Sequence, residues 1–193
     1  MPNWCNNVVK LRHADAAMLI RAQEGFKKGE LLQTFIPCPQ ELRDTQSVHY
    51  PEGHKDKAAQ DALEARNIEN HGFSNWYDWQ VAHWGTKWDV GSEDDTADIE
   101  DGELTLVFDS AWSPPIDAYE RLEDVCGFEI EAYYYEPGMA FCGTWAAGVD
   151  NCIDIPSTSA EAEQVIPEDI DEMFDIVNSM AMWEEDEEEF NEE

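Results

Sequence analysis

The apolar positions of this chain follow two periods, which predict strands and helices in alternation. Some segments alternate apolar and polar residues, as in residues 103–109, where Leu104, Leu106 and Phe108 would share one face of a strand. Other segments repeat every three or four positions, as helices do. The predicted strands are residues 5–13, 31–36, 103–109, 128–135 and 139–147. The predicted helices are residues 16–28, residues 55–70, a short aromatic-rich helix ending at Trp84, and one between Ser113 and Gly127.

The order of these elements predicts the fold class. When residues 37–100 are set aside, the chain reads strand–helix–strand twice, followed by one more strand. This is the ferredoxin-like split βαβ plan, so we expect an α+β domain over residues 1–148. The helical, Trp-rich stretch at about 37–100 is predicted to be an insertion between the second and third strands. Its last part, residues 91–102, is predicted to be an acidic loop.

The character of the chain changes after Gly148. Residues 149–166 are polar and are predicted to be a linker, and residues 167–193 are predicted to form an acidic amphipathic helix and tail. The apolar stripe of this helix consists of Ile170, Met173, Phe174, Val177, Met180 and Ala181. The stripe is suited either to packing on the chain's own domain or to lying in a groove of a partner. Acidic residues at a helix C-terminus oppose the helix dipole, so we expect the end from Trp183 onward to fray.

Composition excludes several classes of protein. A hydrophobic content of 42% supports a packed core, and there is no apolar run of the roughly 18 residues that a membrane span needs. The start, MPNWCNNVVKLRH, lacks the features of a secretory signal, so we expect a cytoplasmic protein. The five cysteines form no C-x-x-C pair, and the five histidines show no metal-binding spacing. We therefore expect no disulfide framework, no metal and no cofactor.

Three tryptophans lie in two short, turn-like segments, W-G-T-K-W-D (residues 84–89) and S-A-W-S-P-P (residues 110–115). In one interpretation they line a small-molecule pocket, because such pockets combine apolar walls with a few polar groups. The candidate pocket residues are Trp84, Lys87, Trp88, Asp89, Trp112 and Glu136. In the other interpretation the tryptophans attach the insertion to the sheet, each burying on the order of 200 Å². No set of nucleophile, base and orienting group can be recognised.

Four motifs together carry a resemblance to a known family. They are M-P-N-W-C-N-N at the start, W-G-T-K-W-D, S-A-W-S-P-P, and E-P-G-M-A-F-C-G at residues 136–143. In their order and rough spacing they resemble the YubB-like, ferredoxin-like family of conjugative plasmids and tailed phages. The resemblance covers residues 1 to about 148. It implies a ferredoxin-like fold and an origin in a mobile element, and it implies no particular activity.

The charge of the chain is concentrated in its second half. Residues 1–88 contain ten Lys or Arg and eleven Asp or Glu, for a net charge of −1. Residues 89–193 contain one basic residue, Arg121, and 33 acidic residues, for a net charge of −32. Salt adaptation would acidify the whole surface, and the near-neutral first half argues against it. The negative field is therefore local and is expected to have a local purpose.

The acidic half has two interpretations. It is either a solvated surface with a solubility tail, or a mimic of nucleic acid that occupies the basic cleft of a partner. Duplex DNA carries one negative charge per about 1.7 Å, so 32 charges match roughly 16 base pairs. The carboxylates at 93–103 and 168–193 would make the contacts. The candidate residues are Glu93, Asp94, Asp95, Asp98, Glu100, Asp101, Glu168, Asp169, Asp171, Glu172, Asp175, Glu184, Glu185 and Asp186.

These observations predict a non-enzymatic, acidic protein of phage or plasmid type. It would act in the host cytoplasm by binding and inhibiting a basic host protein that handles nucleic acid in defence. It would bind neither nucleic acid, which it repels, nor membranes. Two alternatives stay open: a small-molecule-binding or enzymatic domain that uses the Trp84, Lys87, Trp88 and Trp112 cluster, and a virion or replication accessory protein.

Overall fold

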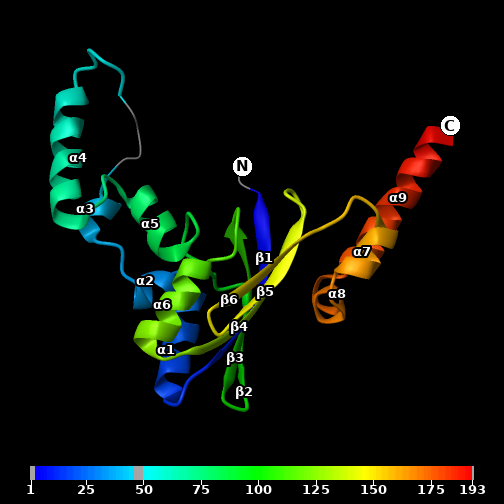
Figure 1. Ribbon diagram of the computed structural model, residues 1–193. Helices are drawn as coiled ribbons and strands as arrows, with labels where there is room; N and C mark the ends of the chain where they lie inside the picture. Colours follow the sequence, from blue (N-terminus) through cyan, green and yellow to red (C-terminus); the bar gives the residue numbers. More distant parts are fainter. Residues whose placement is uncertain (1–2, 46–49, 193) are drawn as a thin grey trace.

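The structure is built around one antiparallel sheet (Figure 1). The computed structural model describes residues 3–45 and 50–192. In this part of the chain the sheet has six strands in the order β2-β3-β1-β4-β5-β6, and all neighbours are antiparallel. The strands are β1 (Trp4–Arg12), β2 (Thr96–Glu100), β3 (Glu103–Ala111), β4 (Glu129–Glu136), β5 (Phe141–Ala146) and β6 (Val149–Asp154).

Two connections join strands that are not neighbours, and they create two split βαβ units. Helix α1 (Ala16–Lys27) lies in the connection from β1 to β2, and β3 occupies the place between these strands. Helix α6 (Ile116–Cys126) connects β3 to β4, with β1 between them. This order confirms the predicted ferredoxin-like α+β plan. Strands β5 and β6 extend the sheet beyond β4.

The insertion is helical, as predicted, but its position differs. Its helices within the described residues are α2 (Leu31–Phe35), α3 (Gln40–Arg43), α4 (Lys57–His71) and α5 (Trp76–Trp84). The prediction of a strand at residues 31–36 is wrong, because this segment forms α2. The insertion therefore lies between α1 and β2, and not between the second and third strands. Figure 1 shows α4 standing away from the sheet.

Segments predicted to be irregular contain regular structure. The predicted loop at 91–102 contains β2, and the predicted linker at 149–166 contains β6 and α7 (Ser159–Val165). The C-terminal helix is two helices, α8 (Glu168–Phe174) and α9 (Ile176–Glu192), separated by Asp175 with a φ of 53°. Helix α9 continues to Glu192, and the fraying of its end stays a prediction. Within the described residues, none of the helices is both long enough and apolar enough to cross a membrane.

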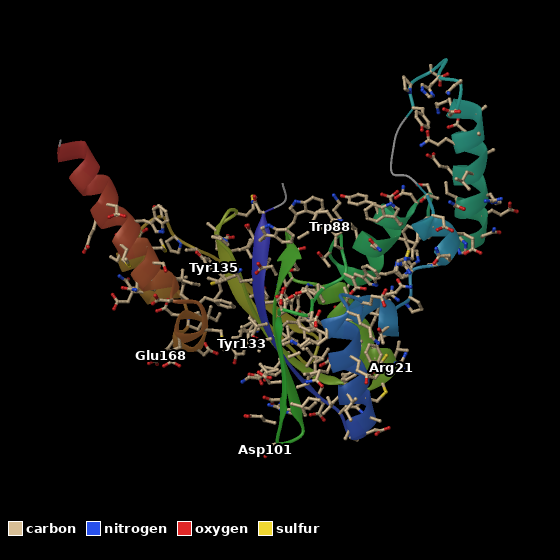
Figure 2. All side chains as sticks on the ribbon, turned by 180° about the vertical axis from the view of Figure 1, so that it is seen from behind. Arg21, Trp88, Asp101, Tyr133, Tyr135 and Glu168 are labelled. Carbon is tan, nitrogen blue, oxygen red and sulfur yellow. The ribbon has the colours of Figure 1, made fainter. Side chains whose placement is uncertain are left out.

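The two faces of the sheet have different covers. Helices α1, α2 and α6 cover one face, where alternate strand residues such as Leu106 pack with Phe26 of α1 in the main core. On the second face α8 lies over β4 and β5, and Tyr133 and Tyr135 face it (Figure 2). Ile170 of α8 is buried there. This confirms the interpretation in which the C-terminal stripe packs on its own domain.

The part of the second face over β2, β3 and β1 is open. Val107 of β3 is 40% exposed, and Asp98 of β2 and Asp109 of β3 are also exposed. These residues alternate with buried ones that point to the helix-covered face. The open area lies between the edge strand β2 and helix α8.

Candidate interaction surface

The two tryptophan-containing motifs are attached to each other by hydrogen bonds. The Ser113 hydroxyl donates to the carbonyl of Gly85 at 2.9 Å, and the Thr86 hydroxyl donates to the carbonyl of Ala111 at 3.1 Å. Gly85 adopts a φ of +73°, and a Cβ there would lie 3.1 Å from backbone nitrogens at the start of α6. Only glycine allows this close approach. The motifs are therefore parts of one assembly at one end of the sheet.

Trp84 belongs to the core. Its side chain is 1% exposed and lies edge-on to Trp79, with the ring centroids 5.9 Å apart. Its indole N–H donates to the carbonyl of Ile36 at 3.0 Å, which satisfies the one polar atom of the ring. Trp84 therefore holds the insertion helices together and is not available as a pocket wall.

Asp89 anchors helix α2. Its carboxylate accepts hydrogen bonds from the backbone N–H groups of Leu32, Gln33 and Val90, each at 2.8 Å. Two of these donors lie in the first turn of the helix, where N–H groups have no partner within the helix. Burial is the largest influence on this carboxyl and raises its pKa to about 6, although the three hydrogen bonds favour the ionised form.

Glu136 closes a turn. It is fully buried, and its carboxylate accepts hydrogen bonds from the N–H groups of Gly138, at 3.1 Å, and of Met139. Its two oxygens are thus used inside the hairpin that joins β4 to β5. Three of the six candidate pocket residues, Trp84, Asp89 and Glu136, therefore have structural contacts.

The remaining candidates form an exposed aromatic patch together with two residues that sequence reasoning missed. Trp88 and Trp112 are 39% and 41% exposed, and Trp4, which is 46% exposed, lies 6.0 Å from Trp88 between ring centroids. The ammonium of Lys87 lies 4.4 Å from the centroid of Trp88, 5.3 Å from that of Trp112 and 5.9 Å from that of Tyr77. Figure 2 shows Trp88 at the end of the sheet. We call Trp4, Tyr77, Lys87, Trp88 and Trp112 the tryptophan patch.

The backbone holds the patch in position. Trp112 has a φ of +71°, which is unusual for a bulky residue and costs on the order of 1–3 kcal/mol. The N–H of Trp112 donates to the carbonyl of Asn3 at 2.9 Å. This hydrogen bond attaches the motif M-P-N-W-C-N-N to the same end of the sheet. Trp4 could have been predicted to belong to the patch, because it lies in the motif M-P-N-W-C-N-N.

The first group of candidate carboxylates lies on and before the edge strand β2. Asp95 is half-buried and the other members of this group are exposed. The ammonium of Lys27 donates to the backbone carbonyls of Glu93 and Asp95, so it holds the loop through its main chain. Figure 2 shows Asp101 at the turn between β2 and β3. The exposed members of this group are Glu93, Asp94, Asp98, Glu100 and Asp101.

The second group lies on and between α8 and α9, and four of its members, Asp169, Asp171, Asp175 and Glu184, accept hydrogen bonds within the chain. Asp171 accepts from the N–H of Val177 at 2.8 Å, and Glu184 accepts from the N–H and hydroxyl of Ser159 at 2.7 and 2.6 Å. The hydrogen bonds from Ser159 lower the pKa of Glu184. The exposed members are Glu168, Asp169, Glu172, Asp175, Glu185 and Asp186. The predicted contacts at residues 187–193 lie outside the described side chains.

Within the described residues, these carboxylates are not paired with basic side chains. In the described part of the chain, the ion pairs that involve the acidic half join Arg12 to Glu103 and, at 3.8 Å, to Glu131. The candidate carboxylates on β2, α8 and α9 are not among them. No group of three or more His, Cys, Asp or Glu in this part of the chain is arranged to hold a metal ion.

The comparisons with known proteins place the chain in a family. Residues 83–180 match the family model described as "Ferredoxin-like domain in Api92-like protein". The chain belongs to this family. It also aligns with the crystal structure of a protein api92 from Yersinia pseudotuberculosis, at 12% sequence identity and a TM-score of 0.42, over 81% of this chain and 99% of that one. No curated protein sequence matches the chain. The family match agrees with the ferredoxin-like topology.

Proposed function

We propose that this is a non-enzymatic protein that binds and inhibits a basic, nucleic-acid-handling protein in the cytoplasm of a host cell. The resemblance of its four motifs to the YubB-like family supports a role in phages or plasmids, whose success depends on evading defence systems. The observation that carries the proposal is the exposure of the β2 and α8–α9 carboxylates, which form no ion pair within the described residues.

Uncompensated carboxylates on fixed elements favour binding over a purely solvating role. A disordered acidic tail provides only average charge, whereas a strand and two helices hold carboxylates at constant spacing. The 33 acidic residues of the second half carry the charge of roughly 16 base pairs of duplex DNA. A partner with a basic cleft would gain the same release of counterions that it gains from DNA, and nucleic acid itself would be repelled.

The test compares two variants of the full-length protein that lose the same charge. A truncation at Gly148 would be a poor probe, because it removes the cover of Tyr133 and Tyr135. The first variant replaces exposed carboxylates of α8 and α9 with their amides: Glu168, Asp169, Glu172, Glu185 and Asp186. The control does the same at exposed positions of the near-neutral half: Glu24, Asp44, Glu52, Asp56 and Glu69. Each immobilised protein is incubated with host lysate and eluted with salt or with duplex DNA.

We expect the natural chain and the control to retain nucleic-acid-binding proteins that elute below about 0.5 M salt, where the Debye length is only about 4 Å. A duplex of about 16 base pairs should also displace them. The α8–α9 variant should retain about tenfold less. Retention of proteins that duplex DNA does not displace, or equal retention by both variants, would refute the proposal.

A ligand-binding domain remains the second candidate, because the tryptophan patch is solvent-exposed. Its walls would be Trp88 and Trp112 with Lys87 between them. Screening by tryptophan fluorescence against small anions and nucleotides would detect such a ligand. Substitution of Lys87 by Ala should then abolish binding while thermal unfolding is little changed.

A further inference from the structure

Two adjoining cavities lie beside the tryptophan patch on the open face of the sheet. The first, of about 260 Å³, is lined by Trp4 and Trp88 among others, and the second, of about 360 Å³, by Phe174 of α8. Asp95 and Asp109 line both cavities. The two cavities therefore form one groove, which has tryptophans at one end, apolar side chains of α8 at the other, and the two shared carboxylates in the middle. We call it the acid–aromatic groove. Asp89 also lines the first cavity, but both of its oxygens already accept backbone hydrogen bonds.

The two carboxylates that line both cavities, Asp95 and Asp109, are only partly satisfied. Asp109 Oδ1 accepts from the side-chain amide of Asn6 at 2.6 Å, and Asp95 Oδ2 accepts from the Ser92 hydroxyl at 2.9 Å. Both donors are neutral, and neither carboxylate forms an ion pair in the described part of the chain. Lys27 bonds to the main-chain oxygen of Asp95 and not to its carboxylate. One oxygen of each carboxylate thus stays available to a ligand.

Carboxylates beside exposed tryptophan rings are suited to binding a cation. A guanidinium stacks on an aromatic face and donates two parallel hydrogen bonds to a carboxylate, which an ammonium cannot do in the same plane. The molecule already shows that one of these rings accepts a cation, because the ammonium of Lys87 lies 4.4 Å from the Trp88 centroid. Lys87 itself does not line either cavity.

We propose that the acid–aromatic groove binds an arginine side chain of the basic partner, stacked on Trp4 or Trp88 and hydrogen-bonded to Asp109 and Asp95. This inference rests on the proposed function, in which the partner is a basic protein. It assigns the central contact to the groove, while the exposed carboxylates of β2 and α8–α9 attract the partner over a longer range. Tryptophan and arginine are among the residues that most often dominate binding energy at interfaces.

The probe is a short peptide with three arginines between glycines, compared with the same peptide containing three lysines. Binding to the full-length protein is followed at low salt by NMR, through the indole N–H signals of the tryptophans. The arginine peptide should shift the signals of Trp4 and Trp88 and bind about fivefold more tightly than the lysine peptide.

Two pairs of variants isolate the groove. Asp109→Asn should weaken binding about fivefold, whereas Asp98→Asn, which removes the same charge from the same face outside the groove, should change it by less than about twofold. Trp88→Ala should weaken binding about fivefold, whereas Trp183→Ala, at a 73% exposed position of α9, should not. The backbone NMR spectrum of each variant establishes that it is folded.

Each outcome supports or overturns the inference. The proposal that the groove binds arginine would be refuted by any of three results. These are equal binding of the arginine and lysine peptides, equal effects of the two Asp variants, or no binding at low salt. Such results would leave the lysate experiment, which tests the proposed function through other carboxylates, unaffected. Conversely, the arginine peptide could bind specifically while no captured protein is displaced by duplex DNA. This result would support arginine binding in the groove and refute the proposed function.

Discussion

Asp89 provides a test of how a half-buried carboxylate serves the fold. Burial raises its pKa to about 6 from an ordinary 3.8, so the folded protein holds this proton more tightly than the unfolded chain does. The stabilising contribution of the protonated group is complete below about pH 4 and is lost as the pH rises through 6. Asp89→Asn cannot ionise and escapes this loss. The variant should therefore gain stability relative to the natural protein as the pH increases.

The size of the effect follows from the shift. Two pKa units correspond to about 3 kcal/mol at most. Between about pH 4.5 and about pH 7.5 the part of this free energy that is lost is about 2 kcal/mol. Asp89→Ala behaves differently, because it leaves the N–H groups of Leu32, Gln33 and Val90 without their acceptor. It should be about 2–4 kcal/mol less stable than Asp89→Asn at both pH values.

The assay is urea unfolding followed by tryptophan fluorescence at the two pH values and constant salt. Asp98→Asn, at an exposed position of β2, is the control for the general loss of one negative charge from the acidic half. If the difference in unfolding free energy between Asp89→Asn and the natural protein is the same at both pH values, the carboxylate is not destabilised by burial and the reasoning fails.

Two further predictions concern packing and thiol chemistry. Gly91→Ala should lower the free energy of unfolding by more than about 2 kcal/mol in thermal denaturation, because its Cβ would lie 2.6 Å from the buried ring of Phe26. Gly102→Ala, also at positive φ but with nothing within 4 Å, should cost only about 1 kcal/mol, and equal losses would contradict the steric explanation. In thiol modification at about pH 8, the exposed Cys152 should react first. Cys5 should react only in denaturant, because burial raises its pKa to about 12, and rapid reaction of Cys5 in the native protein would show that this burial is incomplete.

The regular parts of the fold could be predicted from local patterns. Strands β3 and β4 alternate apolar and polar residues, and α1 is bracketed by Asp15 and Gly29, so their order led to the correct fold class although the second strand was misplaced. Helix α2 could not be predicted in this way. It has five residues, and the carboxylate that stabilises its first turn, Asp89, lies 57 residues away in sequence from Leu32.

The edge strands were missed for a different reason. Strand β2 lies in an acidic run, and only Ala97 is buried there, so the alternation of Ala97 and Ile99 is hidden by carboxylates. Strand β6 buries almost nothing and forms because its backbone pairs with β5. Backbone pairing leaves little trace in side-chain patterns.

Local sequence patterns also could not predict which of the clustered tryptophans are buried and which are exposed. Trp84 and Trp88 lie one helical turn apart in sequence, yet one is 1% and the other 39% exposed. The reason is that α5 ends at Trp84 and the chain turns at Gly85, which reverses the direction of the following side chains. Trp4 and Asp109 join the site only through the pairing of β1 with β3.

The central position of β1 affects how the protein is made. This strand is synthesised well before both of its neighbours, since Cys5 pairs with Ser110 and Asn6 with Tyr135. At about 5–20 residues per second, a ribosome needs roughly 5–20 s to supply the first of these partners. During that time both edges of β1 are unpaired, and pairings this distant in sequence close slowly. During this interval β1 is open to pairing with other chains, which its own β3 prevents once it emerges.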